Sequence, residues 1–296
     1  ILIYNYFTFL IKSFLNISNL ELEQINKILN IKNDNSSLVG KNIGLIFEKN
    51  STRTRVSFTV AIRALGGNPL DLKFEDLNIS RDETFEDTFR ALDCYLDGLV
   101  YRTVDHKKLI EAQKYFNKPI INALSDLSHP CQILSDLFTL FERFGKYKIN
   151  ILWMGDMNNV CFSLVEAANL IKDLKLIICT PENISKNKKW KIGPNISILN
   201  SLQDIDLKSI NCVMTDVFIS MNDKNSDEKI SLLKPYCITP ELMAETSSNS
   251  IFMHCLPAKV GLEVTEEVFR SSKSIVWKQA YNRMVAQKKL LQFIYQ

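Results

Sequence analysis

The sequence predicts an α/β protein built from two doubly wound domains, each a mostly parallel sheet flanked by helices. Short apolar runs of strand length alternate with longer helical segments, an order typical of parallel sheets covered on both faces. The alternation restarts near Gly145–Ile149, and 296 residues suffice for two domains of ordinary size. We therefore expect a first domain over residues 1–145 and a second over 146–274. A C-terminal helix, 275–296, is expected to return to the first domain.

In the first half of the chain, each apolar strand is followed by a helical segment. The expected strands are Asn42–Phe47, Pro69–Phe74, Asp97–Tyr101 and Pro119–Leu124, and the expected helices are Arg53–Leu65, Glu83–Tyr95, His106–Phe116 and Pro130–Phe144. Gly66-Gly67 ends the first of these helices. Pro130 suits the first turn of the last one, because the N–H that proline lacks would have no helical partner there.

The second half repeats the alternation with shorter strands. Here the expected strands are Ile149–Met154, Lys175–Cys179, Ile196–Leu199, Asn211–Thr215 and Ser250–Met253, and the expected helices are Val160–Ile171 and Lys278–Tyr295. The lysine-rich stretch Glu182–Lys191 is polar throughout, so we expect loop and helix surface there.

Composition excludes several classes of protein. Hydrophobic residues make up 46% and charged residues 23% of the chain, which excludes a disordered or collagen-like protein. A net charge of +3 is too small for a nucleic-acid-binding surface. The seven cysteines show no C-x-x-C spacing and there are only three histidines, so we expect neither a zinc site nor a secreted disulfide framework, and reduced thiols in the cytoplasm.

The first residues, Ile1–Leu15, are strongly apolar. They lack the basic start and small-residue cleavage site of a signal peptide. The run is too short to span a membrane and contains Lys12. We expect an added hydrophobic strand or helix, or a stray extension, rather than a targeting segment or a membrane anchor.

Polar side chains follow six of the expected strands. They are Glu48–Arg55, Arg102, His129–Gln132, Gly155–Asn159, Asp216–Met221 and His254–Pro257. Ligands of open parallel sheets bind beyond the carboxyl ends of the strands, so the fold is expected to gather these groups at its binding site.

The segment Ser51–Arg55, S-T-R-T-R, stands where a strand turns into a helix. Backbone N–H groups at a helix start favour an anion, and arginine adds a planar fork that matches phosphate or carboxylate. We therefore expect a phosphate site; the alternative is a helix cap with surface arginines.

His129 and Cys255 each permit two interpretations. The helix that starts at Pro130 disfavours imidazolium, so a neutral His129 would donate a hydrogen bond to a carbonyl oxygen, with Gln132 beside it. The alternative for His129 is a helix cap. Cys255 is either a thiolate or proton carrier, or a small buried hydrophobic residue. The chain lacks G-x-G-x-x-G, a P-loop and a nucleophile elbow, which speaks against a dinucleotide enzyme, an NTPase and a serine hydrolase.

Together these motifs resemble the aspartate/ornithine carbamoyltransferase family, from about Lys12 onward. The matching segments are FEKNSTRTRVSF, Tyr101-Arg102, HPCQ, GDMNN, Asp216 with Ser220-Met221, HCLPA and NRMVAQK. HCLP and D-x-x-x-S-M point to the ornithine branch. The resemblance implies transfer of a carbamoyl group from carbamoyl phosphate to the δ-amine of L-ornithine, giving L-citrulline and phosphate, without metal or cofactor, in a homotrimer whose active sites lie at subunit interfaces.

The resemblance also assigns residues to roles. It implies that carbamoyl phosphate is bound by Ser51, Thr52, Arg53, Thr54, Arg102, His129, Gln132, Cys255, Leu256 and Arg283. It implies that ornithine is bound by Asn159, Asp216, Ser220 and Met221. The catalytic residues would be Arg102, His129, Asp216 and Cys255, with proton handling by Cys255 coupled to Asp216.

Two departures from the family pattern bear on the acceptor. Asn222-Asp223 follow Ser-Met where the family usually has glycine, and Asn78 falls where the ornithine enzymes usually have glutamine. Putrescine or an N-acylornithine as acceptor, or a catalytically silent paralogue, therefore remain the alternatives. The sequence does not distinguish biosynthetic from catabolic flux.

Overall fold

The computed structural model describes the chain except residues 1–10, 12, 33, 81 and 220–225. The chain divides into two compact units, which we call unit 1 (Ile1–Ser125 with Ala286–Gln296) and unit 2 (Asp126–Val285). Each unit contains one five-stranded sheet whose strands all pair in parallel. The predicted fold class is confirmed.

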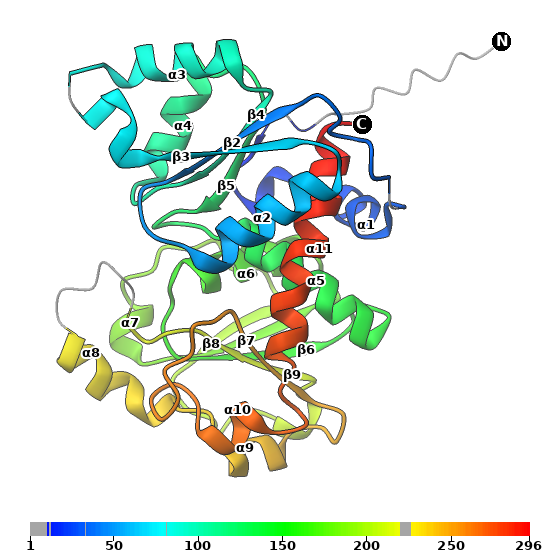
Figure 1. Ribbon diagram of the computed structural model, residues 1–296. Coiled ribbons are helices and arrows are strands. Elements are labelled where there is room, and N and C mark those ends of the chain that lie inside the picture. Colours follow the sequence, from blue (N-terminus) through cyan, green and yellow to red (C-terminus); the bar gives the residue numbers. More distant parts are fainter. Residues whose placement is uncertain (1–10, 12, 33, 81, 220–225) are drawn as a thin grey trace. The chain divides into compact units, whose positions relative to one another are not determined.

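The sheet of unit 1 has the strand order β1-β5-β4-β2-β3. Its strands are β1 (Ser13–Phe14), β2 (Asn42–Phe47), β3 (Asn68–Lys73), β4 (Gly98–Arg102) and β5 (Ile120–Leu124). Its helices are α1 (Leu22–Asn30), α2 (Thr52–Ala64), α3 (Phe85–Tyr95) and α4 (His106–Tyr115). Helices α3 and α4 lie on one face of the sheet and α2 on the opposite face (Figure 1). Burial of β2, β4 and β5 gives this unit its core.

The first described residues of the apolar start form a short strand. β1 pairs with β5 at the edge of the sheet, with Ser13 opposite Ile120. Ser13 and Phe14 at the end of the apolar run thus belong to a sheet, while residues 1–10 and 12, on which an added element would fall, lie outside the described part.

The last helix, α11 (Val276–Ile294), ends in unit 1, as predicted. The Lys289 side chain donates to the carbonyl of Ile31 at 2.8 Å, and the Tyr295 hydroxyl donates to the carbonyl of Asp97 at 2.9 Å. The helix end thus contacts both α1 and the turn before β4.

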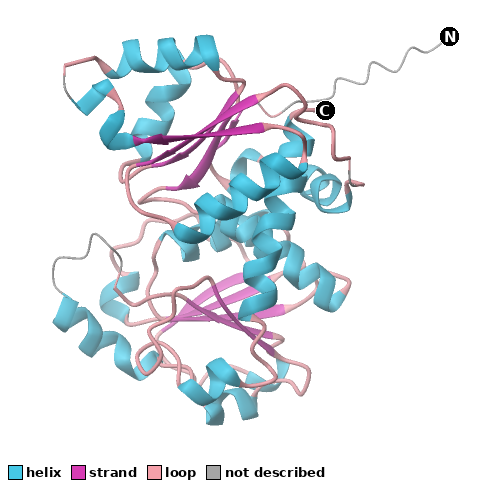
Figure 2. Cartoon of the chain, viewed as in Figure 1, coloured by secondary structure: helices cyan, strands magenta, loops and turns pink. Residues whose placement is uncertain are grey.

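The sheet of unit 2 has the strand order β10-β9-β6-β7-β8. Its strands are β6 (Asn150–Met154), β7 (Lys175–Cys179), β8 (Ile196–Leu199), β9 (Cys212–Thr215) and β10 (Ile251–His254). Its helices are α5 (Pro130–Phe144), α6 (Asn159–Leu170), α7 (Glu182–Ser185), α8 (Ser226–Leu233), α9 (Pro240–Glu245), α10 (Glu266–Arg270) and the first part of α11. Helix α6 lies on one face of this sheet, and α9 and α10 lie on the other, as the ribbons of Figures 1 and 2 show.

The compact units and the expected division of the sequence differ in one helix. The sequence pattern restarts after α5, near residue 145, but α5 contacts α6 and belongs to unit 2.

No described helix has the length and apolar character needed to cross a bilayer.

The topology of unit 2 brings three strand ends together. β6 is central, the chain runs from it to β7 and β8 on one side, and it later returns to β9 and β10 on the other. In the register, Trp153 of β6 is opposite Met214 of β9, and Thr215 of β9 is opposite His254 of β10. The residues that follow β6, β9 and β10 therefore all begin at the carboxyl-terminal end of the sheet.

Candidate functional site

In unit 1, the phosphate-site segment begins beside Arg102. Phe47 at the end of β2 pairs with Arg102 at the end of β4. The next residue, Glu48, donates its backbone N–H to the carbonyl of Arg102 at 3.0 Å. The ends of β2 and β4, two of the strand ends predicted to carry site residues, therefore lie side by side.

The two arginines in the first turn of α2, Arg53 and Arg55, have different surroundings. Arg55 pairs with Asp71 at 3.0 Å and lies over the ring of Phe47, so it is a structural residue. Arg53 is exposed, whereas Thr54 is buried. Ser51 occupies the N-cap position in extended backbone but makes no side-chain cap hydrogen bond. The alternative that this serine serves as an ordinary cap is therefore wrong.

Glu48 anchors the chain on both sides of Arg102, a role the sequence did not reveal. Its carboxylate accepts from the Tyr101 hydroxyl at 2.6 Å, the Thr103 hydroxyl at 3.0 Å, the Val104 N–H at 3.1 Å and the Lys108 ammonium at 2.9 Å. Burial alone would raise the pKa of Glu48, but these hydrogen bonds and the Lys108 charge hold it below its ordinary value. Glu48 is therefore a charged anchor.

In unit 2, Asp216 receives two hydrogen bonds. The Cys255 thiol donates to Oδ1 at 2.8 Å, and the Asn158 amide donates to Oδ2 at 2.7 Å. Burial and the negative charge of Asp216 raise the pKa of Cys255 well above its usual value. Cys255 is therefore a neutral thiol that donates a hydrogen bond to Asp216, and not a thiolate.

Asn158 also caps α6, another role that sequence reasoning missed. Its side-chain oxygen accepts from the N–H groups of Val160 at 3.0 Å and Cys161 at 3.1 Å, while its amide nitrogen faces Asp216. The predicted neighbour, Asn159, is the first residue of the helix. The predicted helix begins at Val160, and the signal would have placed the cap at Asn159, because asparagine is a preferred N-cap residue; the helix begins one residue earlier.

His129 stands at the N-cap position of α5 but makes no side-chain cap hydrogen bond there, so the helix-cap alternative is wrong. The residue is buried, and its backbone N–H donates to the Ser163 hydroxyl at 2.9 Å. One turn on, the Gln132 side-chain oxygen accepts from the Arg283 guanidinium of α11. Three of the predicted carbamoyl-phosphate residues thus lie on α5 and α11 of unit 2.

The backbone after β10 takes an unusual conformation. Leu256 has a φ of 62°, which is rare for a residue with a side chain. Its N–H donates to Nδ1 of His254 at 2.9 Å, and Nε2 of His254 lies 3.3 Å from Glu263. Nδ1 of His254 therefore holds the turn that carries Cys255, and Nε2 lies beside the buried carboxylate of Glu263.

Asp216, His254 and Cys255 each offer a metal-ligating atom, and these atoms lie within 4.8 Å of one another. Metal binding at cysteine needs a thiolate. Here the Cys255 thiol donates a hydrogen bond to Asp216 at 2.8 Å. This hydrogen bond accounts for the closeness of two of the three atoms.

Two predicted ornithine residues, Ser220 and Met221, and the departure Asn222-Asp223 lie outside the described residues. Just beyond them, Lys229 of α8 forms a 2.7 Å ion pair with Asp156, which follows β6. In unit 1, the backbone carbonyl of Asn78 accepts from Glu83 at 3.3 Å.

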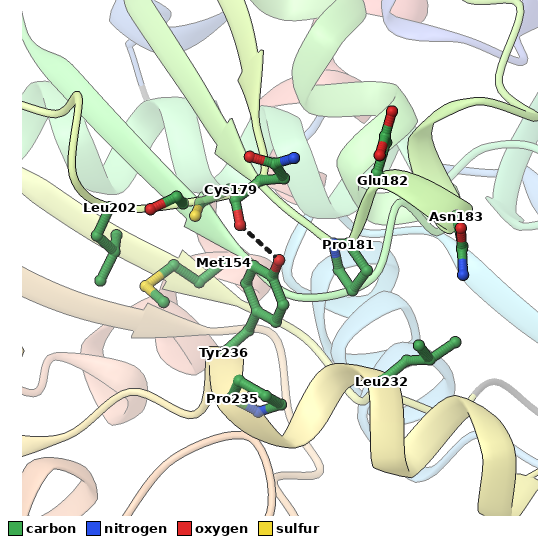
Figure 3. Close-up of a pocket in the computed structure, with 11 residues that line it drawn as sticks. Met154, Cys179, Pro181, Glu182, Asn183, Leu202, Leu232, Pro235 and Tyr236 are labelled. Carbon is green, nitrogen blue, oxygen red and sulfur yellow. Dashed lines mark hydrogen bonds between the residues drawn. The ribbon is translucent and has the colours of Figure 1, made fainter.

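A cavity of about 540 Å³ lies beyond the ends of β6, β7 and β8 in unit 2. The residues drawn in Figure 3 line it, and the Tyr236 hydroxyl donates to the carbonyl of Asn200 at 2.7 Å across one side. None of the predicted site residues lines this cavity. The candidate site is therefore assigned from the residues at the strand ends.

Comparison with known proteins gives matches along almost the whole chain. The aspartate/ornithine carbamoyltransferase carbamoyl-P binding domain matches residues 12–142, and the Asp/Orn binding domain of the same family matches residues 147–294. The curated ornithine carbamoyltransferase of Aquifex aeolicus is 39% identical over 288 residues, which cover 92% of this chain and 93% of that protein.

Two solved structures share the fold at similar length. The ornithine carbamoyltransferase from Pyrococcus furiosus has a TM-score of 0.86 at 36% identity and covers 96% of this chain and 97% of its own. The anabolic ornithine carbamoyltransferase from Campylobacter jejuni has a TM-score of 0.86 at 33% identity, with coverages of 96% and 98%.

Proposed function

The chain belongs to the aspartate/ornithine carbamoyltransferase family, and on that premise we propose that it is an ornithine carbamoyltransferase. It would transfer the carbamoyl group of carbamoyl phosphate to the δ-amine of L-ornithine, giving L-citrulline and phosphate. The observation that carries the proposal is the contact of the Cys255 thiol with Asp216 at 2.8 Å, in a chain whose relatives are named for this reaction.

We propose that unit 1 supplies the main phosphate contacts. Ser51, Thr52, Arg53 and Thr54 stand at the start of α2, where backbone N–H groups and the helix dipole favour an anion. Arg102, held on both sides by Glu48, would contact the carbamoyl oxygen. Negative charge grows on that oxygen during attack, so a fixed guanidinium stabilises the transition state more than the substrate.

The proposed residues of unit 2 complete the contacts. His129, Gln132 and Arg283 would contact the carbamoyl group, and Cys255 with Leu256 would lie beside it. Asn159 and Asp216 would bind the amino-acid end of ornithine, together with Ser220 and Met221. Because Asp216 accepts a hydrogen bond from the Cys255 thiol, it would couple acceptor binding to the residue proposed to handle protons.

The proposed chemistry needs proton removal and positioning. An alkyl ammonium has a pKa of about 10.4, so the δ-ammonium must lose a proton before its nitrogen attacks. The new C–N bond forms at the carbamoyl carbon, a second N–H proton leaves, and the C–O bond to phosphate breaks with its electron pair on phosphate. The carboxylate of Asp216, to which the Cys255 thiol is hydrogen-bonded, would take the first proton, and the departing phosphate oxygen is basic enough for the second. Orientation and charge stabilisation then supply the rate without a covalent intermediate.

Further parts of the proposal concern organisation. Residues 1–145 would bind carbamoyl phosphate, residues 146–274 would bind ornithine, and 275–296 would complete the first domain. The family resemblance supports a homotrimer with active sites at subunit interfaces. A place in arginine biosynthesis is supported by the similar Campylobacter jejuni enzyme, which is described as anabolic. No disulfide joins the cysteines of the described chain, which is typical of a cytoplasmic protein.

The test is to incubate the purified protein with carbamoyl phosphate and, separately, ornithine, putrescine, N-acetylornithine and aspartate, and to measure the ureido product. Citrulline well above the other products supports the proposal. A product only with another amine would retain the phosphate site and refute the acceptor. Folded protein that yields no product with any amine would indicate a silent paralogue.

A further inference from the structure

A buried carboxylate, Asp136 of α5, joins the two proposed halves of the site in unit 2. Asp136 is completely buried. Its Oδ1 accepts from the side-chain amide of Gln132 at 2.9 Å and from that of Gln279 at 2.8 Å. Both glutamines are themselves buried, so neither amide has bulk water as a substitute partner.

A shared acceptor decides which way each amide faces. Because both NH₂ groups donate to Asp136, both carbonyl oxygens face away from it. The Gln132 oxygen accepts from the guanidinium of Arg283, and the Gln279 oxygen accepts from the backbone N–H of His254 at 2.9 Å. A flip of either amide would replace an acceptor by a donor at one of these contacts. Asp136 therefore controls the polarity of two contacts on two different elements.

Resting on the proposed function, we propose that Asp136 is a positioning residue for carbamoyl transfer: through Gln132 it orients Arg283, and through Gln279 it fixes the strand end that carries Cys255. One oxygen atom of Asp136 would thus fix the positions of Arg283, which is proposed to contact carbamoyl phosphate, and of Cys255, which is proposed to handle protons.

The surroundings of Asp136 indicate that the acceptor oxygen, rather than the charge, does this positioning. The titratable and charged groups around it are Arg283 on α11, Cys212 on β9, Asp216 after β9, and Cys255 after β10. Burial raises the pKa of Asp136 to about 7, while the two amides and Arg283 oppose this rise and Asp216 adds to it. The Oδ2 atom has no hydrogen-bond partner among the described residues, so it can carry a proton while Oδ1 still accepts from both amides.

Asp136→Asn and Asp136→Leu separate the two possibilities. Asparagine keeps an acceptor oxygen at the same place, whereas leucine removes it at similar volume. Thr139→Val is the matched control, because Thr139 is buried on the same helix and its hydroxyl accepts from Asn282 of α11 at 2.9 Å. Gln279→Leu removes only the hydrogen bonds that Gln279 makes to Asp136 and to the backbone of His254. It replaces Asp136→Leu as the test variant if Asp136→Leu does not fold.

Each variant is assayed for kcat and KM with both substrates, for carbamoyl phosphate binding by calorimetry, and for Tm. We expect Asp136→Asn to stay within about threefold of the wild type and to keep the pH–rate profile of the wild type. We expect Asp136→Leu and Gln279→Leu to lose about 100-fold in kcat/KM, with Asp136→Leu also binding carbamoyl phosphate about tenfold more weakly. Thr139→Val should lower Tm but leave activity within about twofold.

The inference is overturned if folded Asp136→Leu or Gln279→Leu keeps near-native kcat/KM. It is also overturned if all three variants, Thr139→Val included, lose activity in the same proportion to their loss of Tm. Loss of activity in Asp136→Asn equal to that in Asp136→Leu would overturn the role of the oxygen in favour of the charge. A wild type that binds carbamoyl phosphate but makes no citrulline would refute the proposed function alone. Weaker binding in Asp136→Leu than in Thr139→Val would then still support positioning, and equal binding would overturn it.

Discussion

The contact between Asn158 and Asp216 can be tested by changing one atom group. Asn158→Asp keeps the side-chain oxygen that caps α6, because aspartate is as good an N-cap as asparagine. It replaces the amide donor that now lies 2.7 Å from Asp216 by a carboxylate oxygen. The helix start is preserved while the partner of Asp216 is reversed.

The size of the effect follows from the type of hydrogen bond. A hydrogen bond to a charged group contributes about 1.5–3 kcal/mol. At about 1.36 kcal/mol per factor of ten, its loss corresponds to a decrease of about 10- to 150-fold in kcat/KM for ornithine. Two carboxylates this close also share a proton, which raises the pKa of one of them. The pH at half-maximal activity should therefore move upward.

The assay is citrulline formation from pH 6 to pH 9, with Tm measured on the same samples. Asn158→Ala should lose similar activity but also about 1 kcal/mol of stability, because the cap is removed as well. Thr265→Ala is the control, since Thr265 caps α10 through a 3.4 Å contact with Val268. It should lower stability by about 1 kcal/mol and leave kcat/KM within about twofold.

Native kcat/KM and an unshifted pH profile in Asn158→Asp would refute the reasoning. In that case the hydrogen bond would serve only the fold, and Asp216 would not depend on Asn158 for its role with the acceptor.

Three other predictions concern separate parts of the site. Arg53→Ala should raise KM for carbamoyl phosphate by about 10- to 150-fold, because it removes charge-assisted hydrogen bonds, and near-native affinity would contradict the phosphate assignment. Cys255→Ser should lower kcat by about 100-fold with little change in KM for carbamoyl phosphate; the reverse pattern would make Cys255 a structural residue. Asp136 has a folded-state pKa of about 7, above the ordinary 3.8, so the stability that it contributes is full below about pH 3.8 and is lost as pH rises through 7. Urea unfolding should therefore show Asp136→Asn gaining on the wild type by about 1.4 kcal/mol per pH unit between pH 4 and 7, and parallel stability curves would contradict this.

Strong apolar patterns made most of the fold predictable. The strands of both sheets are apolar enough to be recognised singly, apart from β1, whose two residues give no pattern. The structure also adds α1, α8, α9 and α10, which have 9, 8, 6 and 5 residues. Helices this short complete too few turns to show a periodic apolar face, and tertiary contacts hold them instead.

The candidate site was predictable only where residues directly follow strands. That rule placed Asp216 and Cys255 near each other, and the structure brings them to 2.8 Å. It did not reach Asp136, four residues after Gln132 within a helix, because one sequence does not show which buried donors a helical carboxylate will meet. A signal was nevertheless present: Asp136 stands next to Leu137 on a helix whose buried face is otherwise largely apolar.

The order of the units along the chain has a consequence for biosynthesis. Unit 1 is interrupted by the whole of unit 2 and is finished by residues 286–296. During translation, the first 125 residues leave the ribosome long before the segment whose Tyr295 hydroxyl binds the carbonyl of Asp97. Unit 2 is a continuous segment and can fold as it emerges. Unit 1 is completed only later, because the hydrogen bond from Lys289 to the carbonyl of Ile31, just after α1, cannot form until the end of the chain has been made. The nascent chain is thus expected to reach its stable state in the opposite order from its numbering, with the second unit complete before the first.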